Sequence, residues 1–166
     1  EKARKHAANN PYAMFNTPLS VEEILASDEV FDPLTRFQCC PPTCGAAAAI
    51  LCSDEFAKKH GITKPVYIAA QEMTTDYDSS FKEDSMIKMV GYDMTVAAAK
   101  KVYEKSGVGP KDVDVVELHD CFTANEILTY EGLQLCKEGE AEKFINEGQN
   151  TYGGKYVTNP SGGLLS

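Results

Sequence analysis

Apolar and polar residues along the chain fall into a polar opening segment and a longer, more regularly patterned remainder. Residues 1–34 are mostly polar and are interrupted by prolines. One helix start is clear there, because Ser20 can cap a helix and Glu23, three residues later, completes a capping box. The apolar residues that follow share one helical face. The rest of the segment predicts loops and short helix with little core of its own.

The run from Gly45 to Cys52 is short, continuous and apolar. Its alanines favour a helix, whereas its small residues also suit a fully buried strand packed between helices, and the sequence leaves both structures open. Residues 53–61 predict a short helix. Ser53 would cap it, acidic residues come first, lysines come last, and Gly61 follows its end.

From residue 65 onward, the apolar pattern predicts the order strand, helix, strand, helix, strand. The predicted strands are residues 65–73, 113–118 and 156–158. The predicted helices are residues 93–106, which stop at Gly107, and about 122–135. A polar loop is expected through residues 78–80, and a charged loop follows the second helix. This order predicts an α/β fold with right-handed crossovers.

Composition narrows the class of protein. The 166 residues suit one domain, and 16 basic against 25 acidic residues give a net charge of −9. That charge argues against a general nucleic-acid binder and against electrostatic docking on anionic lipid. No apolar run approaches the roughly 20 residues of a membrane-spanning helix, and no signal peptide opens the chain. The first residue is not Met, and we expect the chain to be a piece of a longer protein.

Candidate chemistry gathers where the predicted strand 113–118 gives way to a helix. His119, Asp120 and Cys121 follow one another there. The dipole at a helix N-terminus favours the thiolate form of a cysteine. Cys121 could therefore act as a nucleophile, or as an acid/base together with His119. The alternative is that Cys121 is a buried structural cysteine beside a core histidine. Asp120 could orient His119, or it could cap the helix.

Other polar positions carry weaker signals. Asn125 and Glu126 fall in the first helical turn, where Glu126 would complement the helix dipole. The loop that contains Gly162 and Gly163 could bring backbone N–H groups to a substrate oxyanion, or it could be an ordinary turn. The six cysteines lack the spacing of a zinc site, and reduced thiols are expected. Neither a dinucleotide fingerprint nor a P-loop is present.

Together these motifs resemble one family. The run LHDCF at 118–122 resembles the HDCF motif of thiolases of the sterol carrier protein x type, where other thiolases carry Asn-Glu-Ala-Phe. The resemblance covers nearly the whole chain and extends to these segments: 37–41, 87–91, 125–131, 150–155 and 159–163.

The resemblance implies an incomplete thiolase-like α/β fold. Residues 1–34 would be the end of the loop domain. Residues 35–63 would be the last strand and helix of the N-terminal half. Residues 64–166 would be a truncated C-terminal half.

The resemblance also implies an activity. Such thiolases cleave 3-ketoacyl-CoA with CoA, in β-oxidation of fatty acids or sterol side chains. By resemblance, Cys121 is the acid/base and His119 an oxyanion donor, both catalytic. Gly162 and Gly163 would contact the substrate, and the structural or orienting residues would be Asp120, Asn125 and Glu126.

The same resemblance implies the partners and the compartment. Coenzyme A would be a substrate and not a cofactor, and no metal is implied. The partners would be acyl-CoA, CoA and further copies of the full-length protein, in the peroxisome. The family's nucleophilic Cys and its Gly-His-Pro motif lie outside this chain, so we expect the fragment alone to be inactive.

Two other functions remain open from the sequence. One is a non-catalytic, thiolase-like protein that binds acyl-CoA or lipid or serves as a partner subunit. The other is a redox or metal module that uses the cysteines.

Cys44 departs from the family pattern, since an acid is expected before the Gly-Ala-Ala-Ala stretch.

Overall fold

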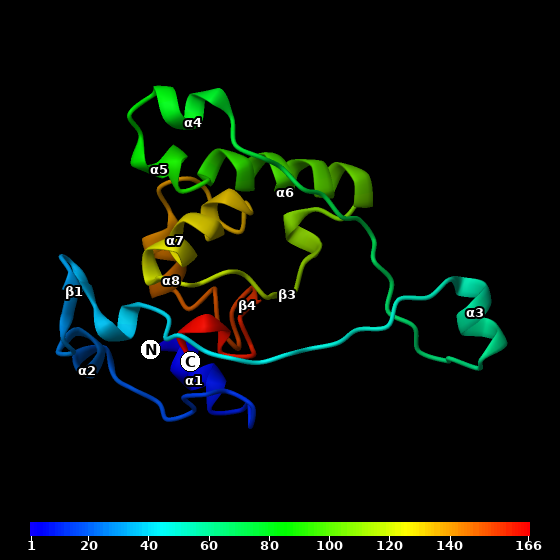
Figure 1. Ribbon diagram of the computed structural model, residues 1–166, viewed down its shortest axis with the longest axis horizontal. Coiled ribbons are helices and arrows are strands. Elements are labelled where there is room, and N and C mark those ends of the chain that lie inside the picture. Colours follow the sequence, from blue (N-terminus) through cyan, green and yellow to red (C-terminus); the bar gives the residue numbers. More distant parts are fainter.

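A computed structural model describes residues 1–166 (Figure 1). It contains eight α-helices, two pairs of short strands and three 3₁₀ turns. In chain order the elements are α1 Lys2–Ala7, α2 Val21–Leu25, β1 Glu29–Phe31, β2 Leu34–Thr35, a 3₁₀ turn Arg36–Gln38, α3 Asp54–Lys59, α4 Asp78–Lys82, α5 Met86–Met89, α6 Tyr92–Ser106, a 3₁₀ turn Pro110–Asp112, β3 Val115–Val116, α7 Thr123–Gly132, α8 Ala141–Asn146, β4 Val157–Thr158 and a 3₁₀ turn Gly163–Leu165.

The core lies where α7 and α8 meet the parallel pair β3 and β4. Val115 pairs with Val157 and Val116 with Thr158. Parallel strands need a crossover between them, and α7 and α8 supply it. The buried residues of this core are Tyr130, Leu135, Phe144 and Tyr156. The mixed α/β order predicted from residue 113 onward is therefore confirmed, with strands shorter than the sequence indicated.

Helices α6 and α7 form close to their predicted bounds. Helix α6 ends at Ser106, and Gly107 caps it in the left-handed conformation with φ of 70°. Helix α7 ends three residues earlier than predicted. Gly132 at its end allows close packing against α6, because a Cβ there would lie 2.9 Å from Cγ2 of Thr95. Helix α6 is the longest at 15 residues, and no helix is long and apolar enough to cross a membrane.

The opening segment contributes more to the core than its polarity predicted. The capping box at Ser20 and Glu23 is present, as expected. Helix α1 was not predicted, yet it buries Ala3 and Ala7 and packs against the 3₁₀ turn at the C-terminus. The two chain ends consequently lie side by side (Figure 1). The strands β1 and β2 form an antiparallel pair that the sequence pattern did not indicate.

Two predicted apolar elements do not form. Residues 45–52 are neither helix nor strand, and residues 65–73 are not a strand; both run extended and almost entirely exposed on either side of α3 (Figure 1). Ile50 is 93% exposed and Val66 is 97% exposed. A strand exists only through pairing, and no neighbouring strand pairs with either segment. Helix propensity alone does not hold a segment of this length.

Two predicted loops contain helices. Helix α4 forms where the polar loop was expected, and α8 forms in the charged loop after α7. In α8 the spacing of Ala141 and Phe144 places both on the buried face. The short helix after Ser53 is as predicted, with Ser53 accepting from the N–H of Phe56 at 3.2 Å.

Candidate functional site

The segment that carries His119 and Cys121 is the turn between β3 and α7. Three hydrogen bonds fix its backbone. The N–H of Leu118 donates to Asn159 Oδ1 at 2.7 Å, and Asn125 Nδ2 donates to the carbonyl of His119 at 2.6 Å. The N–H of Cys40 donates to the carbonyl of Cys121 at 2.8 Å. Asn125 therefore holds the backbone, and not the ring, of His119.

Asn159 connects this turn to two other parts of the chain. It is fully buried and has a positive φ of 48°. Its N–H donates to the carbonyl of Val116 at 2.7 Å, and its own carbonyl accepts from His6 Nδ1 at 3.0 Å. The side chain of Asn159 and its two flanking peptide groups thus hold β3, the turn before α7 and α1 together. The sequence placed Asn159 in a motif without indicating this role.

Asp120 has neither of its predicted contacts. It is fully buried, and its Oδ1 accepts from the N–H of Leu164 at 2.7 Å. It makes no hydrogen bond to His119, and the residue at the N-cap of α7 is Phe122, without a side-chain cap. The side chain instead joins the turn before α7 to the C-terminal turn. Burial raises the pKa of Asp120, and the hydrogen bond from Leu164 opposes that shift.

Cys121 is partly buried, and its thiol does not meet the thiolate-favouring surroundings that the sequence predicted. Burial raises the pKa of Cys121, and the nearby Cys40 thiol raises it further. Helix α7 begins at Thr123, and Phe122, the residue after Cys121, forms an isolated antiparallel bridge with Cys39. His119 is exposed, and its ring makes no hydrogen bond to Cys121. The pair therefore shares a turn without direct contact through a hydrogen bond.

The glycine loop is held by its own hydrogen bonds. The N–H of Gly162 donates to the carbonyl of Asn159 at 3.0 Å, and the N–H of Gly163 donates to Ser161 Oγ at 3.2 Å. With Leu164 bonded to Asp120, these N–H groups are already used within the chain. The expected free donors for a substrate oxyanion are thus absent from this arrangement. Both glycines have positive φ, 102° and 67°, which a side chain would strain.

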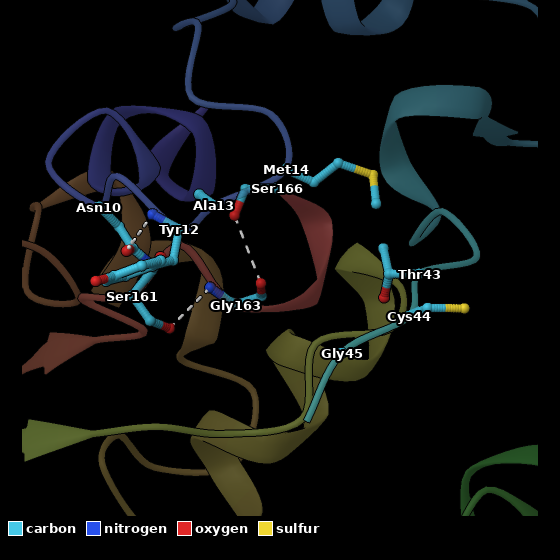
Figure 2. Close-up of a pocket in the computed structure, with 10 residues that line it drawn as sticks. All are labelled: Asn10, Tyr12, Ala13, Met14, Thr43, Cys44, Gly45, Ser161, Gly163 and Ser166. Carbon is cyan, nitrogen blue, oxygen red and sulfur yellow. Dashed lines mark hydrogen bonds between the residues drawn. The ribbon is translucent and has the colours of Figure 1, made fainter. Parts of the chain in front are cut away.

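An open cavity of about 460 Å³ lies beside this loop (Figure 2). Ser161 and Gly163 stand on one side of it, and Cys44 and Gly45 on the other (Figure 2). Neither His119 nor Cys121 lines it. The cavity therefore touches Gly163, one of the two glycines predicted to contact the substrate, but neither Gly162 nor the two predicted catalytic residues.

Glu126 lies in a buried network and is not simply a partner of the helix dipole. It pairs with Lys2, and the two side chains are only 11% and 14% exposed. The hydroxyl of Tyr130 donates to Glu126 at 2.5 Å, and Lys2 also donates to Thr158 Oγ1 at 2.7 Å. Burial and the charge of Glu126 raise the pKa of Tyr130. The network attaches α1 to α7 and β4.

His6 is a residue that sequence reasoning missed. It is 2% exposed, its Nε2 lies 2.7 Å from Thr151 Oγ1, and its ring packs on Tyr152 with centroids 4.7 Å apart. Charged residues precede His6 in the sequence and suggested an exposed segment. The only sequence feature that indicated burial was the spacing of Ala3 and Ala7, which places them on one face of a helix.

The titratable side chains do not form a metal centre. All six cysteines are free thiols, and no group of three or more His, Cys, Asp or Glu side chains could hold a metal ion.

Comparisons with known proteins agree with this fold. Residues 78–166 match the family described as thiolase C-terminal domain-like. "Sterol carrier protein 2" of Rattus norvegicus is 60% identical over 166 residues, covering 99% of this chain and 30% of that protein. "Benzoylsuccinyl-CoA thiolase subunit BbsB" of Thauera aromatica is 46% identical over 165 residues, covering 99% of this chain and 42% of that protein.

A solved structure supports the same assignment. The "Ltp2-ChsH2(DUF35) aldolase" matches 99% of this chain and 43% of its own chain, with a TM-score of 0.77 and 28% identity. The chain thus spans less than half the length of each of these relatives. Since the family match covers more than half of the chain and the fold agrees with it, this chain belongs to the thiolase C-terminal domain-like family.

Proposed function

We propose that this chain is the proton-handling part of a 3-ketoacyl-CoA thiolase. The reaction would cleave 3-ketoacyl-CoA with CoA, giving acetyl- or propionyl-CoA and a shortened acyl-CoA. The observation that carries the proposal is the turn with His119 and Cys121, whose backbone is fixed by hydrogen bonds from Leu118 and Cys40. The relative from Thauera aromatica, named a thiolase subunit, supports this choice.

The two side chains would have different roles. Cleavage between the α-carbon and the keto carbon generates a carbanion that must receive a proton. Cys121, with its raised pKa, is a protonated thiol suited to give that proton and to recover it in the reverse direction. His119 is exposed on the same turn and has an unbonded ring, so its N–H can meet a thioester oxygen.

The remaining parts of the proposal concern the whole protein. The end of a loop domain would be residues 1–34. The last strand and helix of the N-terminal half would be residues 35–63, and the truncated C-terminal half would be residues 64–166. The acylated Cys and the second His would lie on other segments. Coenzyme A would be a substrate, the full-length protein would form homo-oligomers, and the compartment would be the peroxisome, with fatty-acid or sterol side-chain β-oxidation as the setting.

Thiolysis by the longer protein that contains this chain tests the proposal. We expect Cys121→Ala to lower kcat for cleavage of acetoacetyl-CoA by about 10²–10⁴-fold, the usual contribution of a general acid/base. Cys136→Ala is the matched control, because Cys136 is also a partly buried free thiol but packs beside the core. A full-length protein without thiolysis, or a Cys121→Ala variant with unchanged kcat, would contradict the proposal.

A second candidate is binding of lipid or acyl-CoA without catalysis. The name of the Rattus norvegicus relative, "Sterol carrier protein 2", favours it. Binding without catalysis predicts that the full-length protein binds acyl-CoA saturably and releases no shortened acyl-CoA. The same thiolysis assay, run beside equilibrium binding, separates the two functions.

A further inference from the structure

Cys40 and Cys121 lie opposite each other. An isolated antiparallel bridge pairs Cys39 with Phe122, and extending that register by one residue brings Cys40 opposite Cys121. The hydrogen bond from Cys40 N–H to the Cys121 carbonyl, at 2.8 Å, confirms this register. Only this one bond joins the two residues. Opposed residues at such a position of an antiparallel pair have Cα atoms about 5.5 Å apart and side chains on one face. A disulfide requires Cα atoms roughly 4.4–6.8 Å apart.

Access and surroundings also suit this pair of thiols. Both are free and only partly buried, so small oxidants and reductants reach them. The Cys40 thiol raises the pKa of Cys121, which agrees with two sulfurs on the same face. Cys39, by contrast, directs its thiol to the carbonyl of Thr35 at 3.5 Å, and successive side chains of an extended segment point to opposite sides.

We propose that Cys40 and Cys121 form a reversible disulfide that switches off the proton transfer assigned to Cys121. The site itself rests on the geometry; its effect on catalysis rests on the proposed function. The oxidant would be a peroxide and the reductant a dithiol.

The chemistry balances with hydrogen peroxide. One thiolate attacks a peroxide oxygen, breaks the O–O bond and becomes a sulfenic acid, while hydroxide takes up the released proton as water. The second thiolate attacks the sulfenic sulfur, the S–S bond forms, and a second water leaves. Two thiols lose two electrons in total, and the peroxide gains them. A dithiol reverses the step by thiol–disulfide exchange, which partly exposed disulfides allow.

Peptide mapping of the full-length protein tests the site. After brief treatment with hydrogen peroxide and alkylation of remaining thiols, we expect one cross-linked peptide pair joining Cys40 to Cys121, which disappears on reduction. Cys40→Ser should remove it. Cys39→Ser is the matched control at the adjacent position and should retain it. Absence of the cross-link in oxidised wild-type protein, or a cross-link through Cys39, would overturn the inference.

Activity measured on the same samples separates this inference from the proposed function. We expect peroxide to lower wild-type thiolysis more than tenfold and dithiothreitol to restore it. In Cys40→Ser, Cys121 has no partner to trap its sulfenic acid, and further peroxide oxidises it to the irreversible sulfinic acid. Dithiothreitol should therefore restore a smaller share of the activity than in the wild type. A cross-link in a protein that shows no thiolysis would support the disulfide and contradict the proposed thiolase activity. Thiolysis without any cross-link would support the thiolase activity and contradict the disulfide.

Discussion

Asp120 Oδ1 accepts a hydrogen bond from the backbone N–H of Leu164 at 2.7 Å, across 44 residues of sequence. The contact joins the turn that carries His119 and Cys121 to the glycine turn at the C-terminus. Asn159 makes the second connection, through its side chain to Leu118. Two motifs that are separate in the sequence are therefore one structural unit.

The titration of Asp120 should make stability depend on pH. Burial raises its folded-state pKa above the ordinary value of 3.8. The folded state then binds more protons than the unfolded state between the two pKa values, so this contribution to stability is full below 3.8 and is lost as pH rises through the folded pKa. Relative to Asp120→Asn, the wild-type free energy of unfolding should fall from about pH 4 toward neutrality. Urea unfolding of both proteins at several pH values measures the difference in their free energies of unfolding. A wild-type advantage that grows as pH rises would contradict the prediction.

Gly163→Ala should destabilise the chain by more than about 2 kcal/mol, from backbone strain together with overpacking. A Cβ there would lie 2.2 Å from Asp120 Oδ2 and 2.6 Å from Asn159 Nδ2, at a φ of +67°. Gly153→Ala is the control, since Gly153 also has a positive φ, of 86°, but no atom lies within 4 Å of its added Cβ. Thermal and urea unfolding should rank the two variants in that order; equal losses would show that strain alone decides.

His6→Ala should cost about 2–3 kcal/mol, because it removes two buried hydrogen-bond partners and ring packing. The carbonyl of Asn159 and the hydroxyl of Thr151 lose their contacts with the ring. His60→Ala, at the exposed end of α3, should change stability by less than about 0.5 kcal/mol. Urea unfolding monitored by circular dichroism provides the comparison, and similar values for both variants would refute the anchoring role of His6.

Lys2 and Glu126 should show strong energetic coupling. Removing either partner leaves a buried charge alone, which costs about 3–5 kcal/mol, and the double variant Lys2→Met with Glu126→Gln should cost much less than the sum. The surface pair Lys143 and Glu147, 3.9 Å apart with side chains 71% and 51% exposed, should couple by less than about 0.5 kcal/mol. Double-mutant cycles measured by urea unfolding give both values. Additive costs at Lys2 and Glu126 would refute the network.

How far the sequence predicted the structure depends on the range of the interactions. The capping box of Ser20 with Glu23 and the glycine after Ser106 were correctly predicted, because each involves residues within one helical turn. The segment 65–73 was wrongly predicted as a strand, because strand-like composition does not supply a pairing partner. The thiolate-favouring surroundings predicted for Cys121 were wrong although the helix starts within one residue of its predicted position, because burial and the position of Cys40 were not visible in the sequence.

The sequence by itself determined the start of α2, the end of α6, the family motifs and the identity of the side chains that can move protons. Only the tertiary structure decided the partners of those side chains. Asp120 bonds to Leu164 and not to His119, and His6 is buried although its neighbours are charged. The physical reason is that burial and hydrogen-bond pairing depend on which distant segment reaches a residue. These hydrogen bonds join residues that are 44 to 153 positions apart in the sequence, so no local sequence pattern predicts them.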